Sequence, residues 1–425
     1  MGKTGYISKD SRSAFYLISG AGIICFFLLA FRYGNQMYLW LIQENKDSIR
    51  FSDYFFHYAM SAKRHELYQS IGWDATGCFP PLAYCMYHLL YRISAQAGFV
   101  PRSLPEAESI PGALPLFMYY MIFTAVIFFT GISVTGSRNR KKDFLIFTLL
   151  MCSAVFMGSG YVSGNSCMLV LGLLILGLKL KDSPVPFHRE TGIFLLAVCV
   201  ALKLYPAVFG LLFLKEKKYK ELIRLIIYSA LLLFVPFLFF GGISGLKAWV
   251  RHISSTMRYS DYGRLQYFQG IYFTLIKKFT GREKSTLSMF LSFASALVLA
   301  LLAWKSKNRY RTLFFLITIM VFFPANAYRY TLAYFSIPLI MYLKEEQPEK
   351  EKTHWLSWIG MILSGLLFTI PVWWTLVFPF TKTYPIYTVT SVEIYLYLVT
   401  YLLIFSVLFS EIYSWCAQGK GAKTE

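Results

Sequence analysis

Long apolar runs alternate with short, mostly basic segments along almost the whole chain. The runs approach the length of about 20 residues that an α-helix needs to cross a bilayer. The pattern predicts an all-α polytopic membrane protein in which residues 1–425 form a single membrane-embedded domain. About ten runs are predicted to cross, namely Ala14–Phe31, Ala113–Val134, Phe144–Met157, Cys167–Leu178, Ile226–Phe240, Leu287–Trp304, Thr312–Phe323, Leu332–Leu343, Trp355–Phe378 and Val392–Phe409.

The basic segments give the chain a predicted orientation. Lys3, Lys9 and Arg12 precede the first run, and the segment SRNRKKD at 137–143 follows the second. Cytoplasmic loops are enriched in Lys and Arg, so both segments and both termini are predicted to be cytoplasmic. Residues 32–112 and 241–284 then become two large segments on the outer face. The first run has no small-residue cleavage site, which indicates a retained helix rather than a signal peptide.

The run Thr191–Leu214 does not fit a single crossing. Basic residues precede it, and the cluster KEKKYK at 215–220 follows it, so both ends are predicted to be cytoplasmic. Pro206 removes a backbone donor near the middle of the run, and proline breaks helices. The sequence therefore predicts a broken or re-entrant helical hairpin with its break at Lys203–Pro206.

Composition excludes a soluble protein. The chain is 56% hydrophobic and 19% aromatic, with only 15% charged residues. Its net charge of +20 is distributed over short loops rather than one soluble face, which favours membrane lipids over nucleic acid as partners. No Gly-rich nucleotide loop, CxxC pair or HExxH motif is present, so a soluble nucleotide site is not expected. Of the seven cysteines, only Cys78 and Cys85 could pair outside the membrane.

The first outer segment carries the strongest candidate for chemistry, Asp53. It lies among aromatic residues suited to a membrane-interface cleft, and the later stretch Leu82–Ala97 is predicted to be an interface helix. An alternative is that Ser52 or Asp53 only caps a helix over Tyr54–Leu67. His57 follows Asp53 by four residues and shares a helix face with it, but two ligands without a third predict no metal site.

Other polar residues on the predicted outer face could bind a charged sugar donor. Asn165 opens a span and could bind a sugar hydroxyl or simply start a helix. Lys203 lies in an apolar hairpin, where a charge is costly and therefore a functional candidate, unless its side chain reaches the cytoplasmic interface. The remaining candidates are arginines and tyrosines suited to phosphate or a sugar face, or else to the membrane interface: Arg251, Arg258, Arg264, Tyr328, Arg329 and Tyr330.

Several short motifs resemble glycosyltransferase family 87, the polyprenyl-phosphate-mannose-dependent mannosyltransferase-like proteins of the GT-C superfamily. In that family an outer aspartate is followed by a tyrosine and by an aromatic-Pro-Pro sequence. Here Asp53, Tyr68 and Phe79-Pro80-Pro81 match these residues. Three further motifs of the family also have counterparts: a Gly-Asn helix start at Gly164-Asn165, a Lys-x-x-Pro break at Lys203–Pro206, and a Pro segment ending in basic or aromatic residues at Pro324–Tyr330. Where members often carry histidines, this chain has Arg329 and Tyr330, and Gln266–Gly270, which includes Gln269, replaces an Asn-Gln-Ser-like motif.

The resemblance implies a GT-C fold and an enzyme that needs no metal or other cofactor. It implies transfer of a sugar from a polyprenyl-phosphate donor to a lipid or glycan acceptor at the outer face of the cell membrane. Asp53 would be the general base of one inverting displacement. Arg329, Lys203 or the arginines of 251–264 would stabilise the departing phosphate. The other residues placed at the substrate by this resemblance are His57, Tyr68, Asn165, Gln269, Tyr328 and Tyr330.

Two other functions fit parts of the sequence. A broken helix with a lysine also resembles a transporter or flippase of a lipid-linked or anionic substrate, although no inverted repeat is visible and the polar residues favour the outer face. A non-catalytic scaffold would leave Asp53 and Arg329 dispensable.

Overall fold

The computed structural model is helical throughout the residues that it describes. These are residues 10–33, 51–69, 77–96, 99, 101, 104–153, 155–157, 164–259, 266–283, 285–324, 329–347, 354–377 and 385–421. The α-helices are α1 (Arg12–Tyr33), α3 (Ser52–Ala62), α4 (Pro81–Ser94), α5 (Leu104–Glu108), α6 (Ala113–Val134), α7 (Arg140–Met151), α8 (Cys167–Leu180), α9 (Pro186–Leu202), α10 (Gly210–Lys215), α11 (Tyr219–Phe234), α12 (Gly242–Tyr259), α13 (Phe268–Thr280), α14 (Ser285–Lys305), α15 (Arg309–Phe322), α16 (Ser336–Lys344), α18 (Trp355–Val377) and α19 (Pro385–Gly421). The 3-10 helices are η1 (Arg64–Glu66), η3 (Tyr205–Phe209), η4 (Val235–Phe239) and η5 (Arg329–Phe335).

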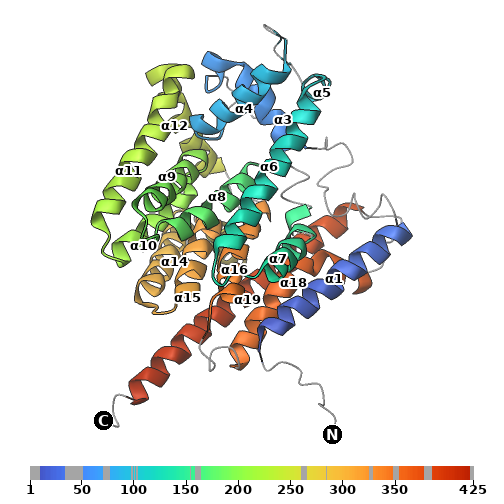
Figure 1. Ribbon diagram of the computed structural model, residues 1–425, viewed down its shortest axis with the longest axis vertical. Coiled ribbons are helices and arrows are strands. Elements are labelled where there is room, and N and C mark those ends of the chain that lie inside the picture. The colour runs from blue at the N-terminus through green and yellow to red at the C-terminus, as the bar shows by residue number, and fades with distance from the viewer. Residues whose placement is uncertain are drawn as a thin grey trace.

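Helix α8 lies at the centre of the molecule (Figure 1). It packs between α6 and α9, and α9 packs in turn against α11. Its sequence is apolar on every side, and nearly all of its side chains are buried. An all-round apolar helix needs neighbours on every side, so the sequence of α8 accounts for its central position.

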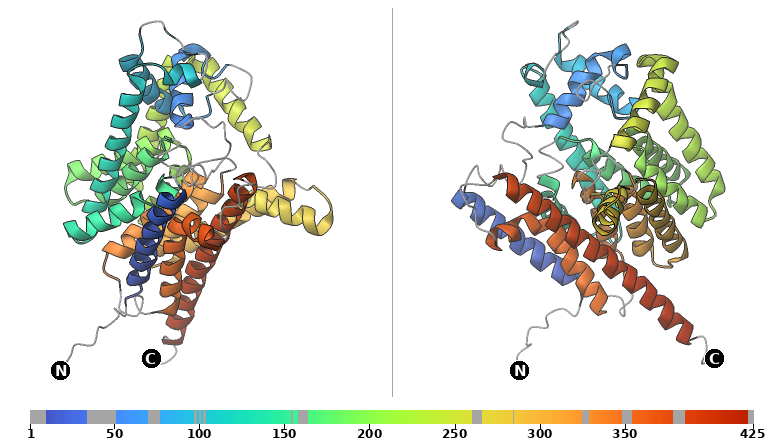
Figure 2. Two further views of the ribbon diagram at one scale, coloured as in Figure 1. Left: turned by 90° about the vertical axis from the view of Figure 1, so that its right-hand side faces the viewer. Right: turned by 180° about the vertical axis from the view of Figure 1, so that it is seen from behind.

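Two further groups of helices surround this centre. Helix α18 packs between α1 and α19, and α13, α14, α15 and α16 follow one another as neighbours. The first group lies side by side in both further views, and α13 with the start of α14 projects from one side of the molecule (Figure 2). Most exposed residues of α11 and α14 are apolar, as expected for helices that face lipid.

The two ends of the molecule differ in what they carry. The start of α1 and the end of α19 lie toward one end, and α3, α4 and α12 lie at the other (Figure 1). Helix α6 begins near α5 at the second end and leads down to the basic segment 137–143. The orientation of these two ends in the membrane stays a prediction.

The length of the helices confirms an integral membrane protein. Five described helices are long and apolar enough to cross a membrane: Arg12–Arg32, Ala113–Val134, Tyr219–Phe239, Thr286–Lys305 and Leu396–Cys416. Shorter apolar helices cover Cys167–Leu180, Tyr205–Lys215 and Trp355–Thr369. The number of about ten crossings remains a prediction, because several of the runs expected to cross form helices shorter than about 20 residues.

The broken hairpin is confirmed. Helix α9 ends at Leu202, Lys203 has an extended backbone, and the chain resumes as η3 and α10. The ammonium of Lys181, before α9, lies 2.8 Å from the carboxylate of Glu216, after α10. Lys218 pairs with Asp182 at 2.7 Å, and Arg309 joins the same carboxylate at 3.0 Å. The two ends of the segment therefore meet, and its broken tip is placed away from them.

We expect Gly192 to be essential for the packing of α9, the first arm of this hairpin, against the end of α8. A Cβ added at Gly192 would lie 2.3 Å from the backbone nitrogen of Lys181, a contact that the backbone cannot relieve by rotating a side chain. Gly192→Ala should therefore lower the free energy of unfolding by about 1–3 kcal/mol, measured as a fall in the thermal midpoint of the purified protein.

Gly210→Ala is the matched control. Its Cβ would meet only the flexible Leu222 side chain, at 3.6 Å, and alanine is the better helix former within α10. Its midpoint should stay the same or rise. Equal midpoints for the two variants would contradict the close approach at Gly192.

Candidate functional site

Asp53 and Asn165 meet although they are far apart in the sequence. Asp53 lies in the first turn of α3, and its Oδ2 accepts a hydrogen bond of 2.8 Å from the side-chain amide of Asn165. The other end of that amide is fixed, because the Asn165 carbonyl oxygen accepts from the backbone N–H of Cys167 at 3.0 Å. The buried asparagine thus holds one oxygen of the carboxylate in a defined place.

The turn before Asn165 allows this approach. Gly164 has a φ of +67°, and a Cβ at this position would lie 2.8 Å from side-chain atoms of Tyr54 and Phe117. Only glycine fits both the left-handed backbone and the space. Helix α3 begins at Ser52 with Phe51 at the cap position and no side-chain cap bond. The interpretation of Ser52 or Asp53 as only a helix cap is therefore wrong.

Lys203 lies at the broken tip of the hairpin and reaches the same region. Its side chain is buried, and its ammonium lies 3.2 Å from the centroid of the Phe79 ring and 5.8 Å from that of Tyr330. Phe79 contacts His57 in turn, and His57 lies on the same helix, α3, as Asp53. Of the two orientations left open by the sequence, the structure has the one in which Lys203 faces the residues of the first outer segment.

His57 lies behind the Phe79 ring. The two ring centroids are 3.9 Å apart, and Nδ1 of His57 is 3.1 Å from the hydroxyl of Tyr84. Burial first, and then the positive charge of Lys203, hold the pKa of His57 well below its usual range, so the imidazole is neutral. The sequence placed His57 at the substrate, whereas its contacts in the structure are with the aromatic residues of the site.

Tyr68 and Cys78 complete the support of this aromatic group. The Tyr68 hydroxyl donates a 2.9 Å hydrogen bond to the backbone carbonyl of Phe79, and the backbone N–H of Cys78 donates to the Tyr84 hydroxyl at 3.1 Å. Cys78 is exposed, and its pKa is raised, because burial raises it by more than the positive charge of Lys203 lowers it. Cys78 and Cys85 are both free thiols.

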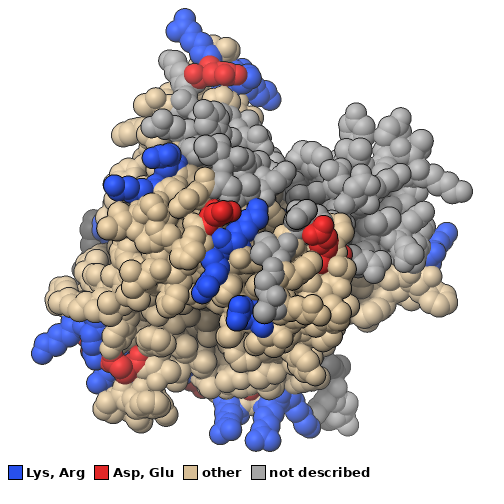
Figure 3. Space-filling view, turned by 90° about the horizontal axis from the view of Figure 1, so that it is seen from above, with Lys and Arg blue, Asp and Glu red and all other residues tan. Residues whose placement is uncertain are grey.

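Fewer contacts with Lys203 and Asp53 are seen for the remaining predicted residues. Tyr330 and Arg329 begin η5, and Tyr330 forms the second aromatic wall beside Lys203. Arg251 is exposed on α12, and Gln269 is half-buried on α13. Seen from the end that carries α3 and α4, Lys and Arg side chains are scattered over a mostly neutral surface (Figure 3). The Arg258 side chain, Arg264 and Tyr328 lie outside the described residues.

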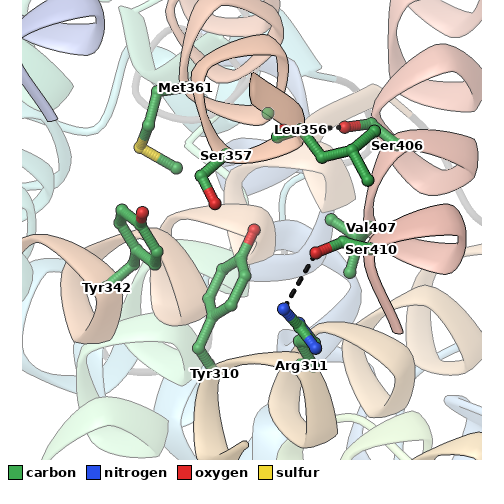
Figure 4. A pocket seen from close by; sticks show the side chains of 10 residues that line it. Tyr310, Arg311, Tyr342, Leu356, Ser357, Met361, Ser406, Val407 and Ser410 are labelled. Atoms are coloured by element: carbon green, nitrogen blue, oxygen red, sulfur yellow. Dashed lines mark hydrogen bonds between the residues drawn. The ribbon is translucent and has the colours of Figure 1, made fainter. Parts of the chain in front are cut away.

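A small pocket between α15, α16, α18 and α19 is separate from these residues (Figure 4). Its one charged lining residue, Arg311, lies 3.0 Å from Glu411 and donates a 2.8 Å hydrogen bond to Ser410. The pocket contains none of the predicted site residues. The arginine there joins α15 to α19 and so serves the fold.

The family model of glycosyltransferase family 87 matches residues 90–326, which is more than half of the chain. The chain belongs to glycosyltransferase family 87. No curated protein and no solved structure is significantly similar to it. This family 87 protein is therefore a membrane glycosyltransferase, which acts on a sugar donor and an acceptor in the membrane. The matched region includes Asn165 and Lys203, whereas Asp53 and Phe79 precede it.

The sequence analysis gave three residues of the site no functional role, although one belongs to a family motif and another was considered for a disulfide. These are Phe79, Tyr84 and Cys78, whose importance depends on contacts with α3 and with the hairpin tip. The aromatic-Pro-Pro motif drew attention to the position of Phe79. No local sequence pattern indicated that its ring would contact the ammonium of Lys203.

The position of Cys78 can be tested with a thiol reagent. Lys203 stabilises the Cys78 thiolate, so Lys203→Met should slow labelling of Cys78 by about 3- to 10-fold near neutral pH, measured by mass spectrometry. Cys416, which is also exposed, is the internal control and should label at an unchanged rate. An unchanged rate at Cys78 would mean that Lys203 does not lie beside it.

Proposed function

We propose that this family 87 glycosyltransferase transfers a sugar, a hexose such as mannose, from a polyprenyl-phosphate donor to a lipid glycan or cell-envelope acceptor. One observation carries the proposal. A buried asparagine orients the Asp53 carboxylate on α3, and the buried ammonium of Lys203 lies on the Phe79 ring, which packs against His57 of the same helix. A reaction that removes a proton from one substrate and leaves negative charge on the other requires groups of these two kinds.

Asp53 is the proposed general base. An acceptor hydroxyl oxygen forms a bond to the anomeric carbon of the donor sugar while the bond from that carbon to the phosphate oxygen breaks. The phosphate keeps the electron pair, and Asp53 takes the hydroxyl proton. A single displacement of this kind inverts the anomeric configuration. Asn165 donates to one oxygen of Asp53, which leaves the orientation of the other oxygen defined as well.

Lys203 is the proposed partner of the departing phosphate. Its side chain is 5% exposed, and within the described part of the chain its ammonium contacts aromatic rings rather than a carboxylate or carbonyl. A buried charge of this kind is stabilised strongly by an incoming anion. Arg329, at the start of η5, is the proposed second cation for the phosphate, because its neighbour Tyr330 lies beside Lys203.

The active site is proposed to face the outside of the cell membrane. The basic segment 137–143 lies beside the start of α1, because Arg12 and Lys142 both donate to the backbone carbonyl of Leu343, whereas α3 and α4 lie at the opposite end of the molecule (Figure 1). The positive-inside rule makes the first end cytoplasmic. A polyprenyl-phosphate donor would then reach Asp53 from the outer leaflet, and its lipid chain would stay in the bilayer.

Loss of the base is the main test. Asp53→Asn keeps the shape of the side chain and removes its basicity, so kcat should fall by about 10²–10⁴ with a smaller change in KM. Transfer would be measured with radiolabelled polyprenyl-phosphate mannose, and then with the glucose donor, into a lipid extract. Asn165→Ala should lower kcat by a smaller factor, because Asp53 remains but loses its fixed orientation.

Glu106→Gln provides the matched control. This carboxylate is exposed on α5, at the same end of the molecule as Asp53. Its loss should leave transfer unchanged. A folded Asp53→Asn protein with full activity would overturn the assignment of the base.

A further inference from the structure

The ring of Phe79 contacts both Lys203 and His57. One face of its ring is directed at the Lys203 ammonium, and the ring packs against the imidazole of His57. We propose that Phe79 is the positioning residue of the site, whose ring holds the Lys203 ammonium where it meets the donor phosphate. This inference rests on the proposed function and adds to it the residue that fixes the phosphate-binding cation.

The Phe79 ring is well placed to act as a fixed support. The Tyr68 hydroxyl holds its backbone carbonyl, and its ring centroid lies 3.9 Å from that of His57. Pro80 and Pro81 follow at once and begin α4, and two prolines leave the backbone little conformational freedom. A ring fixed in this way defines the position of a long, flexible side chain that rests on it.

His57 contributes by remaining neutral. The Tyr84 hydroxyl accepts a hydrogen bond from the backbone N–H of Cys78, so its own proton is available for Nδ1 of His57. Either atom can donate in that bond, and the imidazole is neutral in both cases: its proton lies on Nε2 when the Tyr84 hydroxyl donates, and on Nδ1 when Nδ1 donates. A protonated His57 would place a second positive charge behind the ring and would weaken the attraction of the ring for Lys203.

The contact between Lys203 and Phe79 is electrostatic as well as steric. A cation is attracted to the negative face of an aromatic ring when it lies within about 6 Å of the centroid, most strongly where water is excluded. The ammonium lies 3.2 Å from the Phe79 centroid and is shielded from solvent. Tyr330 offers a second and more distant ring at 5.8 Å. If Phe79 only filled space, the shape of its ring would matter and its electron density would not.

Fluorinated phenylalanines at position 79 separate these two roles. Added fluorine atoms progressively weaken the negative face of the ring and change its size little. We expect the Kd for polyprenyl phosphate, measured by direct binding, to rise stepwise to about tenfold for the trifluorinated ring, or about 1.4 kcal/mol. The thermal midpoint of the protein without added lipid should fall in the same order. A Kd that does not change along the series would overturn the positioning role.

Repeating the fluorinated series in a Lys203→Met variant shows whether its effects depend on the lysine. In this variant no cation faces the ring, so the same fluorinated series should change neither the midpoint nor the residual Kd. The same substitutions at Phe128 are a second control, because its ring neighbours are Phe147 and Phe156 rather than a cation. An equal fall in the midpoint with and without Lys203 would show that fluorination acts through packing alone, and would also overturn the proposal.

These readouts distinguish this inference from the proposed function. The thermal midpoint needs no substrate, and the Kd needs the phosphate lipid but no turnover. If sugar transfer fails with every donor while the midpoint depends on fluorination only when Lys203 is present, the Lys203–Phe79 contact stands and the proposed reaction falls. If transfer is normal and both readouts are insensitive to fluorination, the reaction stands and the role of Phe79 falls.

Discussion

One buried positive charge constrains the site more than any other feature. An ammonium removed from water is strongly destabilising unless nearby groups compensate it. Lys203 is 5% exposed, and the two aromatic rings beside its ammonium come from distant parts of the chain: Phe79 and Tyr330. Most of the local architecture can be understood as the means of bringing these groups to the lysine.

The broken hairpin supplies the lysine, and the central helix supplies the orientation of the carboxylate. Ion pairs at Lys181 and Glu216 close the base of the hairpin, and the extended backbone at Lys203 forms its tip. Asn165, directly before α8, holds Asp53 in the first turn of α3. A broken helix that carries a lysine was compatible with a transporter, but in this family 87 glycosyltransferase the same break places the lysine ammonium on the Phe79 ring.

Local signals in the sequence predicted a good part of this arrangement. Pro206 and the basic clusters on both sides predicted the hairpin, because proline and charge bias act within a few residues. The contact of Asp53 with Asn165, and that of Phe79 with Lys203, each join residues more than 100 positions apart, and no periodicity pairs such residues. His57 was found by its spacing from Asp53, yet its packing on Phe79 required the position of α4. The count of crossings stayed open because short helices such as α7 and α10 give weak length signals.

The most direct test is a cryo-electron microscopy map of the protein in lipid nanodiscs with bound polyprenyl phosphate. The account predicts density for the phosphate in contact with the Lys203 ammonium, with Phe79 on the other side of that ammonium and the Asp53 carboxylate facing the same site. A phosphate bound elsewhere on a folded protein, with Lys203 directed away from the Asp53 side, would contradict the central claim that these residues form one site.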